Sequence, residues 1–172
     1  MKNDYTVLLM DNYPLVIDSY KRTLINLSEA NTNINFQIEI ATDSDQAYQR
    51  IKDLTRKINV VILEINLPPA KNKKFLSGDD IALKIKELIP ESRIIISTSF
   101  NDNYRINNIL KNINPDGLLI KEDLTSEIIG EAVLEVLNDP PYYSKTVTKL
   151  LRKKVTNDFL LDKNDWQGDS NY

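Results

Sequence analysis

Five polar residues follow four separate apolar runs of this sequence, and together they could bind a cation and an anionic group. Asp11 and Asn12 follow "TVLLM", Glu64 follows "VVIL", Thr98 follows "RIIIS" and Lys121 follows "GLLI". If these runs are parallel strands, their carboxyl ends meet at one edge of a sheet, where ligands gather in open α/β folds. Two carboxylates, an amide, a hydroxyl and an ammonium would then converge. We therefore expect Glu64 to face a polar pocket and not the core.

The composition excludes several kinds of catalytic and cofactor-binding site. Cysteine and histidine are both absent, which excludes disulfides, thiol nucleophiles, Cys/His zinc sites and triads that need a histidine base. The sequence contains only four glycines, and their positions form neither the G-x-G-x-x-G motif nor a P-loop. With a net charge of −3, no overall basic field is expected to attract this chain to nucleic acid.

The N-terminus and the apolar runs predict a cytoplasmic protein with no membrane partner. The first residues, "MKNDYTVLLMD", lack the longer apolar core of a signal peptide. No run approaches the roughly 20 apolar residues that a membrane-spanning helix needs.

The elements that must position these polar residues alternate regularly along residues 1–139. Short apolar runs predict five strands, at residues 6–10, 34–40, 60–63, 93–97 and 117–120. Apolar residues at helical spacing follow each of them. Runs that are continuously apolar indicate a parallel sheet covered on both faces by right-handed crossovers. We therefore predict an α/β fold with a doubly wound, five-stranded parallel sheet over residues 1–139.

Residues 140–172 are predicted to form a linker helix and a tail. Ser144 can cap a last helix that carries Val147, Leu150 and Leu151 on one side. The tail, "NDFLLDKNDWQGDSNY" (157–172), is too short to form a domain and too apolar for an inert linker, so we expect it to dock. In the long basic loop "PAKNKKFLSGDD" (69–80), we expect two apolar residues to act as anchors, Phe75 and Leu76.

Four stretches of this sequence resemble the receiver domain of bacterial two-component response regulators. They are "LLMDNYPLV" (8–16), "VVILEINLPP" (60–69), "IIISTSFND" (94–102) and "DGLLIKEDLTSEIIGEAVLEVL" (116–137). The resemblance implies a flavodoxin-like fold and phosphorelay signalling, with a sensor histidine kinase as a partner.

The C-terminal part further resembles the subfamily whose receivers precede a LuxR-type helix-turn-helix domain. In "GLLIKEDLTSEIIGEAVLEVLNDPPYYSKTVTKLL", the "YYS" turn would lead into the linker helix. A segment like "FLLDKNDWQ" would open a DNA-binding domain whose remainder is absent from this chain. The resemblance implies a transcription regulator that binds DNA only through that C-terminal domain and that can form a homodimer. We expect this chain to be a receiver segment of a longer protein or a stand-alone form.

Carried over by position, the resemblance assigns a metal site to the strand ends. Asp11 and Asn12 fall on the acidic pair that binds Mg²⁺, Glu64 falls on the phosphorylated aspartate, and the backbone carbonyl of Asn66 falls on a further metal ligand. Asn12 removes one formal charge from a site for a hard cation that prefers carboxylates. Glu64 is one methylene longer than aspartate, which moves its oxygen by more than about an ångström against a tolerance of about half that. We expect weak or absent Mg²⁺ binding and no phosphorylation of Glu64.

The resemblance also assigns the residues that respond to phosphorylation. Thr98 falls on the switch hydroxyl, Lys121 on the phosphate-pairing lysine, and Leu118 on a position often held by a rotating aromatic ring. Glu64 supplies one negative charge directed towards Lys121 and Thr98, where a phosphoryl group would supply nearly two. We therefore expect Glu64 to imitate the phosphorylated acid and to contact Lys121.

Three functions stay open from the sequence. The first is an atypical receiver that acts as a signalling and dimerisation module of a transcription regulator and is not an enzyme. The second is a receiver that is still phosphorylated, on Glu64 or a nearby acid. The third is a small flavodoxin-like enzyme, such as a phosphatase with an aspartyl nucleophile. Its chemistry needs an aspartate and a second acid two residues later, where this chain has Glu64 and Asn66.

Overall fold

A six-stranded parallel sheet lies at the centre of the computed structural model, which describes residues 1–54, 57–71 and 77–168. The strand order is β2-β1-β3-β4-β5-β6, and every neighbouring pair is parallel. The strands are β1 (Asn3–Met10), β2 (Ile34–Ala41), β3 (Ile58–Glu64), β4 (Arg93–Thr98), β5 (Gly117–Ile120) and β6 (Tyr142–Tyr143).

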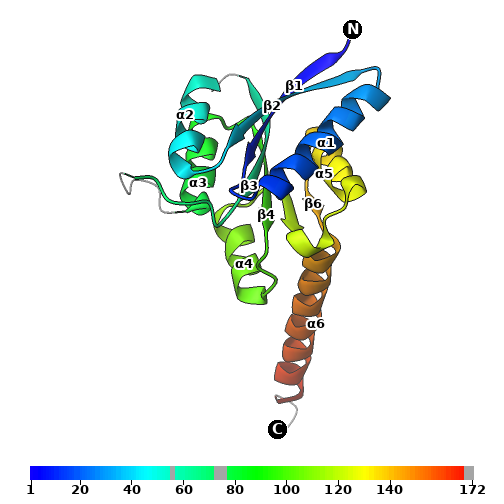
Figure 1. The fold of residues 1–172 in the computed structure, drawn as a ribbon. Helices are drawn as coiled ribbons and strands as arrows, with labels where there is room; N and C mark the ends of the chain where they lie inside the picture. The colour runs from blue at the N-terminus through cyan, green and yellow to red at the C-terminus, as the bar shows by residue number, and fades with distance from the viewer. Residues whose placement is uncertain (55–56, 72–76, 169–172) are drawn as a thin grey trace.

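Helices cover both faces of this sheet (Figure 1). They are α1 (Pro14–Ala30), α2 (Ser44–Leu54), α3 (Gly78–Leu88), α4 (Asn103–Asn112), α5 (Ser126–Asn138) and α6 (Lys145–Gly168), with a 3-10 turn, η1 (Lys121–Asp123), after β5. Helices α1 and α5 pack on one face, and α2, α3 and α4 pack on the other. The doubly wound α/β fold that the sequence predicted is therefore confirmed.

The prediction of five strands is wrong by one, because Tyr142 and Tyr143 add a sixth strand at the edge of the sheet. They lie opposite Gly117 and Leu118 of β5, and the Tyr142 amide donates to the Asp116 carbonyl at 2.9 Å. A two-residue strand is too short to show any periodicity, so this segment looked like a turn in the sequence. The packing of the sheet consequently continues past residue 139.

Successive residues of the central strands are buried on opposite faces of the sheet, as the pleat of a strand requires. In β3, Val61 and Leu63 join the core under α2, α3 and α4, whereas Val60 and Ile62 join the core under α1 and α5. All four are at most 1% exposed. Burial on both faces explains why this run of the sequence is continuously apolar.

Local sequence signals set the starts of the helices. Pro14 occupies the first turn of α1, where its missing N–H costs nothing. Asp43, Asp102 and Thr125 stand just before α2, α4 and α5, and the side chain of each accepts a hydrogen bond from an amide of the first turn. These hydrogen bonds fix the residues at which α2, α4 and α5 begin.

The start of α6 is fixed by a carboxylate from another segment of the chain. Asp123, in η1, accepts hydrogen bonds from the Ser144 hydroxyl at 2.7 Å, the Thr146 amide at 2.9 Å and the Thr146 hydroxyl at 2.8 Å. Ser144 was expected to cap this helix, but its hydroxyl instead donates to Asp123 and accepts from the Ile120 amide at 3.0 Å. From this joint α6 runs away from the sheet (Figure 1).

Two expectations of the sequence fall outside what the structure describes. Phe75 and Leu76, the expected loop anchors, are not among the described residues, and neither are the side chains of the tail at 159–172. Within the described residues, no helix has both the length and the apolar character needed to cross a bilayer.

We predict that Asp123→Asn loosens the joint between the sheet and α6. Burial alone would raise the pKa of Asp123, but the hydrogen bonds from Ser144 and Thr146 and the charge of Lys145 hold this pKa below its ordinary value of 3.8. Because folding lowers this pKa, the ionised Asp123 stabilises the fold fully above its unfolded-state pKa. This contribution is lost as the pH falls through the lower, folded-state pKa. At pH 7 the variant should therefore lose roughly 1 kcal/mol of unfolding free energy.

Urea unfolding of the wild type and the variant, at pH 7 and below pH 3.8, measures this difference. The difference in unfolding free energy between wild type and variant should be smaller in acid, where the protonated aspartate resembles asparagine. The control is Glu122→Gln, at the neighbouring position, which should change little. An equal loss at both pH values, or an equal loss in the control, would show that the charge of Asp123 does not hold the joint.

Candidate functional site

Asp11, Glu64 and Lys121 meet at the carboxyl edge of the sheet, and we call these three residues the acid–lysine cluster. The Lys121 Nζ lies 2.8 Å from the Asp11 Oδ2 and 3.2 Å from the Glu64 Oε2. The expected contact between Glu64 and Lys121 is therefore confirmed, and Asp11 shares the same ammonium.

The pleat of the strands explains why these side chains converge on one side of the sheet. Leu9, Ile62 and Leu119 belong to the core under α1 and α5. Each member of the acid–lysine cluster stands two residues after one of them, so all three point to that same side. The parallel arrangement then brings the three strand ends together at one level.

The acid–lysine cluster is buried and carries one positive charge for two negative charges. Asp11 and Glu64 are 1% and 2% exposed, and the side chain of Lys121 is 13% exposed. The ring of Tyr13 lies over the ammonium, with its centroid 5.1 Å from Nζ. The Tyr13 amide also donates to the Asp11 Oδ1 at 2.9 Å. Asp11 is thus bonded through both of its oxygens, and the excess negative charge falls on Glu64.

Glu64 is the less well satisfied of the two acids. Its Oε1 accepts a long hydrogen bond of 3.4 Å from the Asn66 amide, and its Oε2 contacts Lys121 without hydrogen-bond geometry. Burial raises the pKa of Glu64, and the charge of Asp11 adds to this effect, while Lys121 and the Asn66 amide oppose it. A buried carboxylate with a raised pKa is sensitive to any change in the position of Lys121.

Thr98 does not join the acid–lysine cluster as the sequence predicted. It is fully buried at the end of β4, and the alternation of that strand directs it to the side of Ile94 and Ile96, under α3 and α4. Its Oγ1 accepts a hydrogen bond from the Phe100 amide at 3.2 Å. Among the described residues, no hydrogen bond joins Thr98 to Glu64 or Lys121.

A different pair of hydroxyls lies on the side of the sheet that carries the cluster. Ser97 stands opposite Glu64 in the sheet, and its Oγ accepts a 2.7 Å hydrogen bond from the hydroxyl of Tyr20 in α1. Both residues are at most 1% exposed. Burial raises the pKa of Tyr20, and the nearby charges of Asp11 and Glu64 raise it further despite this hydrogen bond. Neither Tyr20 nor Ser97 was among the site residues expected from the sequence.

The remaining predicted site residues contribute no side chain to the cluster contacts. Asn12 and Asn66 are both exposed, and in the described part of the chain neither side chain bonds to the cluster. Leu118 is completely buried in β5, where it lies opposite Tyr143 of the edge strand. The roles that the resemblance assigns to these residues stay predictions.

The residues at this edge of the sheet do not fit a divalent cation as they stand. The ammonium of Lys121 already lies against both carboxylates, between which a metal would bind. Asn12 adds no charge, and within the described residues no group of three or more acidic, histidine or cysteine side chains could hold a metal ion. The Lys121 ammonium therefore provides the positive charge beside Asp11 and Glu64 that Mg²⁺ would provide in a metal site.

The sequence is similar to curated bacterial regulators, although no protein-family model matches it. It is 27% identical over 129 residues to the oxygen regulatory protein NreC of Staphylococcus haemolyticus, covering 72% of this chain and 55% of that protein. It is 27% identical over 143 residues to the transcriptional regulatory protein MctR of Rhizobium johnstonii, covering 82% and 59%. The chain therefore spans little more than half the length of these relatives.

The fold is similar to solved structures of RcsB from Salmonella enterica serovar Typhimurium. The isolated REC domain with the phosphomimetic BeF3⁻ superposes with a TM-score of 0.72 at 20% identity, over 86% of this chain and 99% of that chain. RcsB bound to the promoter P1flhDC superposes with a TM-score of 0.73 at 20% identity, over 91% and 70%. The expected resemblance to a receiver domain is confirmed by this fold and by the regulators among the relatives.

We predict that Mg²⁺ stabilises a Lys121→Met variant but not the wild type. Removing the ammonium leaves two adjacent carboxylates without a counter-charge, so a divalent cation gains affinity for them. Millimolar Mg²⁺ should then raise the melting temperature of the variant by mass action and leave that of the wild type almost unchanged.

Thermal unfolding with Mg²⁺ or with excess chelator measures the effect. The control is Lys111→Met, which removes an exposed ammonium from α4 and should give no response to Mg²⁺. A wild type that is stabilised as much as Lys121→Met would contradict the view that Lys121 takes the place of the metal.

Proposed function

We propose that this chain is an atypical response-regulator receiver module, in which the acid–lysine cluster replaces the phosphorylated, metal-bound site of its family. The observation that carries the proposal is the contact of 3.2 Å between the Glu64 carboxylate and the Lys121 ammonium. Glu64 stands at the end of β3, the position of the phosphorylated aspartate in the receivers that this sequence resembles. Its carboxylate reaches the lysine that a phosphoryl group would otherwise bind.

The charges at this site support a partial imitation of the phosphorylated state. A phosphoryl group would supply about 1.5 to 2 negative charges, whereas Glu64 supplies one. Much of the attraction between the buried partners is offset by the cost of removing both from water. We therefore infer that Glu64 biases the equilibrium between inactive and active arrangements without locking it.

The same contacts argue against phosphorylation of the cluster. The Glu64 carboxylate is displaced by its extra methylene and held by Lys121, and the site does not favour the Mg²⁺ that phosphoryl transfer requires. Asp11, the other carboxylate of the cluster, is bonded to both Lys121 and the Tyr13 amide. The alternative of a receiver phosphorylated by a sensor histidine kinase is therefore the second candidate.

The relatives support a role in transcription regulation. MctR is a transcriptional regulatory protein, and RcsB has been solved bound to DNA as dimers. By analogy, this chain would act in a homodimer and reach DNA through a further C-terminal domain, with α6 as the connection. Asp123 ties the start of α6 to the turn that carries Lys121, so a change at the cluster has a direct route to the linker helix.

An enzymatic role has less support. A phosphatase with an aspartyl nucleophile needs a second acid two residues after it, and this chain has the exposed amide of Asn66 at that position. Glu64 itself is buried and contacts a lysine, which leaves no open approach for a substrate.

We predict that Glu64→Gln weakens dimerisation or DNA binding of the full-length regulator. The substitution keeps the shape of the side chain and removes the charge that binds Lys121. The cost of burying both groups offsets much of their attraction, and Lys121 keeps its 2.8 Å contact with Asp11 in the variant, so the effect should be modest, about fivefold. Sedimentation equilibrium and titration of operator DNA measure it, with Glu91→Gln at an exposed position before β4 as the matched control.

The two candidates are separated by treating the wild type with acetyl phosphate and Mg²⁺ and measuring its intact mass. The atypical receiver should gain no phosphoryl group. An unchanged affinity of Glu64→Gln would remove the phosphomimetic role, and a phosphorylated wild type would favour the second candidate.

A further inference from the structure

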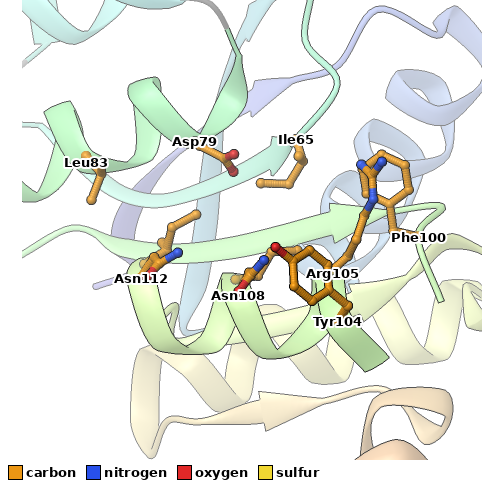
Figure 2. Close-up of a pocket in the computed structure, with 10 residues that line it drawn as sticks. Ile65, Asp79, Leu83, Phe100, Tyr104, Arg105, Asn108 and Asn112 are labelled. Atoms are coloured by element: carbon orange, nitrogen blue, oxygen red, sulfur yellow. The ribbon is translucent and has the colours of Figure 1, made fainter. Parts of the chain in front are cut away.

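A groove lies between α3 and α4, on the side of the sheet opposite the acid–lysine cluster (Figure 2). Its volume is about 530 Å³, within the roughly 300–1,000 Å³ of typical ligand pockets. The floor is apolar, because Ile65, Ile109 and Ile113 are each at most 6% exposed and line it. An apolar floor with a few polar groups around it is the usual composition of a site for a small organic ligand.

Two opposite charges border this groove without neutralising each other. Asp79, in the first turn of α3, directs its carboxylate into the space (Figure 2). Arg105, on α4, lays its guanidinium over the ring of Phe100, 3.9 Å from the centroid. Burial and the charge of Asp80 raise the pKa of Asp79, whereas the charge of Arg105 lowers it. Asp79 and Arg105 therefore interact electrostatically. In the described part of the chain, however, neither forms an ion pair.

Amide side chains complete the polar border. Asn108 and Asn112, four residues apart on α4, also line the groove. Each offers both a donor and an acceptor. Such groups suit a ligand that carries an amide bond between its charged ends.

We propose that this groove binds a small zwitterion with an apolar body, of the class of dipeptides with aromatic or branched aliphatic side chains. The free ammonium would bind Asp79, the free carboxylate would bind Arg105, and the apolar side chains would cover the floor. The opposite charges at the two ends of such a ligand complement Asp79 and Arg105, and its amide bond complements Asn108 and Asn112. An internal segment of a partner protein carries neither free terminus and could match the two charges only through charged side chains.

Binding in this groove would reach the site through two neighbouring residues. Ile65 directly follows Glu64, and the amide of Phe100 donates to the Thr98 hydroxyl. A ligand that packs against Phe100 therefore changes the hydrogen bond of the predicted switch residue. This coupling rests on the proposed receiver function, whereas the binding itself does not.

The test is titration of the ¹⁵N-labelled chain with L-leucyl-L-phenylalanine, followed by amide chemical shifts. The blocked analogue N-acetyl-leucyl-phenylalanine amide, which lacks both charges, is the control ligand. We expect saturable shifts at Ile65, Phe100 and Ile109 with the dipeptide. Binding of the analogue should be about a hundredfold weaker, because it loses both charge-assisted hydrogen bonds.

Two variants with matched controls test the charges. Asp79→Asn and Arg105→Gln should each weaken dipeptide binding about tenfold. Glu87→Gln on α3 and Lys111→Gln on α4, both exposed, should leave it unchanged. Equal binding of the two ligands, or an equal effect of the control variants, would overturn the proposal.

Two further outcomes also bear on it. Shifts at the groove that follow protein concentration without any ligand would show an interface between copies of the chain and overturn the proposal. Saturable binding that shifts Ile65, Phe100 and Ile109 but leaves the Thr98 amide unmoved would establish the site and remove its coupling to the proposed receiver function.

Discussion

One ammonium shared between two buried carboxylates is the interaction on which this edge of the structure depends. Lys121 is positioned by the end of β5, Asp11 by β1 and Glu64 by β3, so the contact joins three strands at a single point. Burial makes each charge expensive unless it is matched, and one lysine matches only part of the two acids. The residual negative charge makes the cluster responsive, because a small shift of Lys121 changes the balance of all three groups.

The sheet separates this charge balance from the predicted switch residue. The cluster and the Tyr20–Ser97 hydrogen bond lie on the side of α1 and α5, whereas Thr98 and the groove lie on the side of α3 and α4. The ends of β3 and β4 carry residues of both sides, since Glu64 precedes Ile65 and Ser97 precedes Thr98. Under the proposed function, communication between the two sides would pass through adjacent residues of two hydrogen-bonded strands, and not through a direct bond between Glu64 and Thr98.

Much of this arrangement could be predicted from the sequence because strand ends and apolar periods are local signals. The doubly wound sheet and the meeting of Glu64 with Lys121 follow from five apolar runs and the polar residues after them. The sixth strand could not be predicted, since two residues show no period. The side to which Thr98 points depends on the register of β4, and the bond between Asp123 and Thr146 joins residues that no local pattern connects. The Tyr20–Ser97 hydrogen bond could not be predicted, because the ring of Tyr20 fits an apolar helix position and nothing local connects its hydroxyl to Ser97.

A double-mutant cycle between Glu64→Gln and Lys121→Met tests the central claim most directly, with the free energy of unfolding as the readout. With Lys121 present, Glu64→Gln removes both an attraction to the ammonium and a repulsion from Asp11, whereas in the Lys121→Met background it removes only the repulsion. The account predicts that Glu64→Gln is more stabilising, or less destabilising, in the Lys121→Met background, with a coupling of about 0.5–3 kcal/mol. An equal effect of Glu64→Gln in the two backgrounds would contradict a shared ammonium as the organising contact of this site.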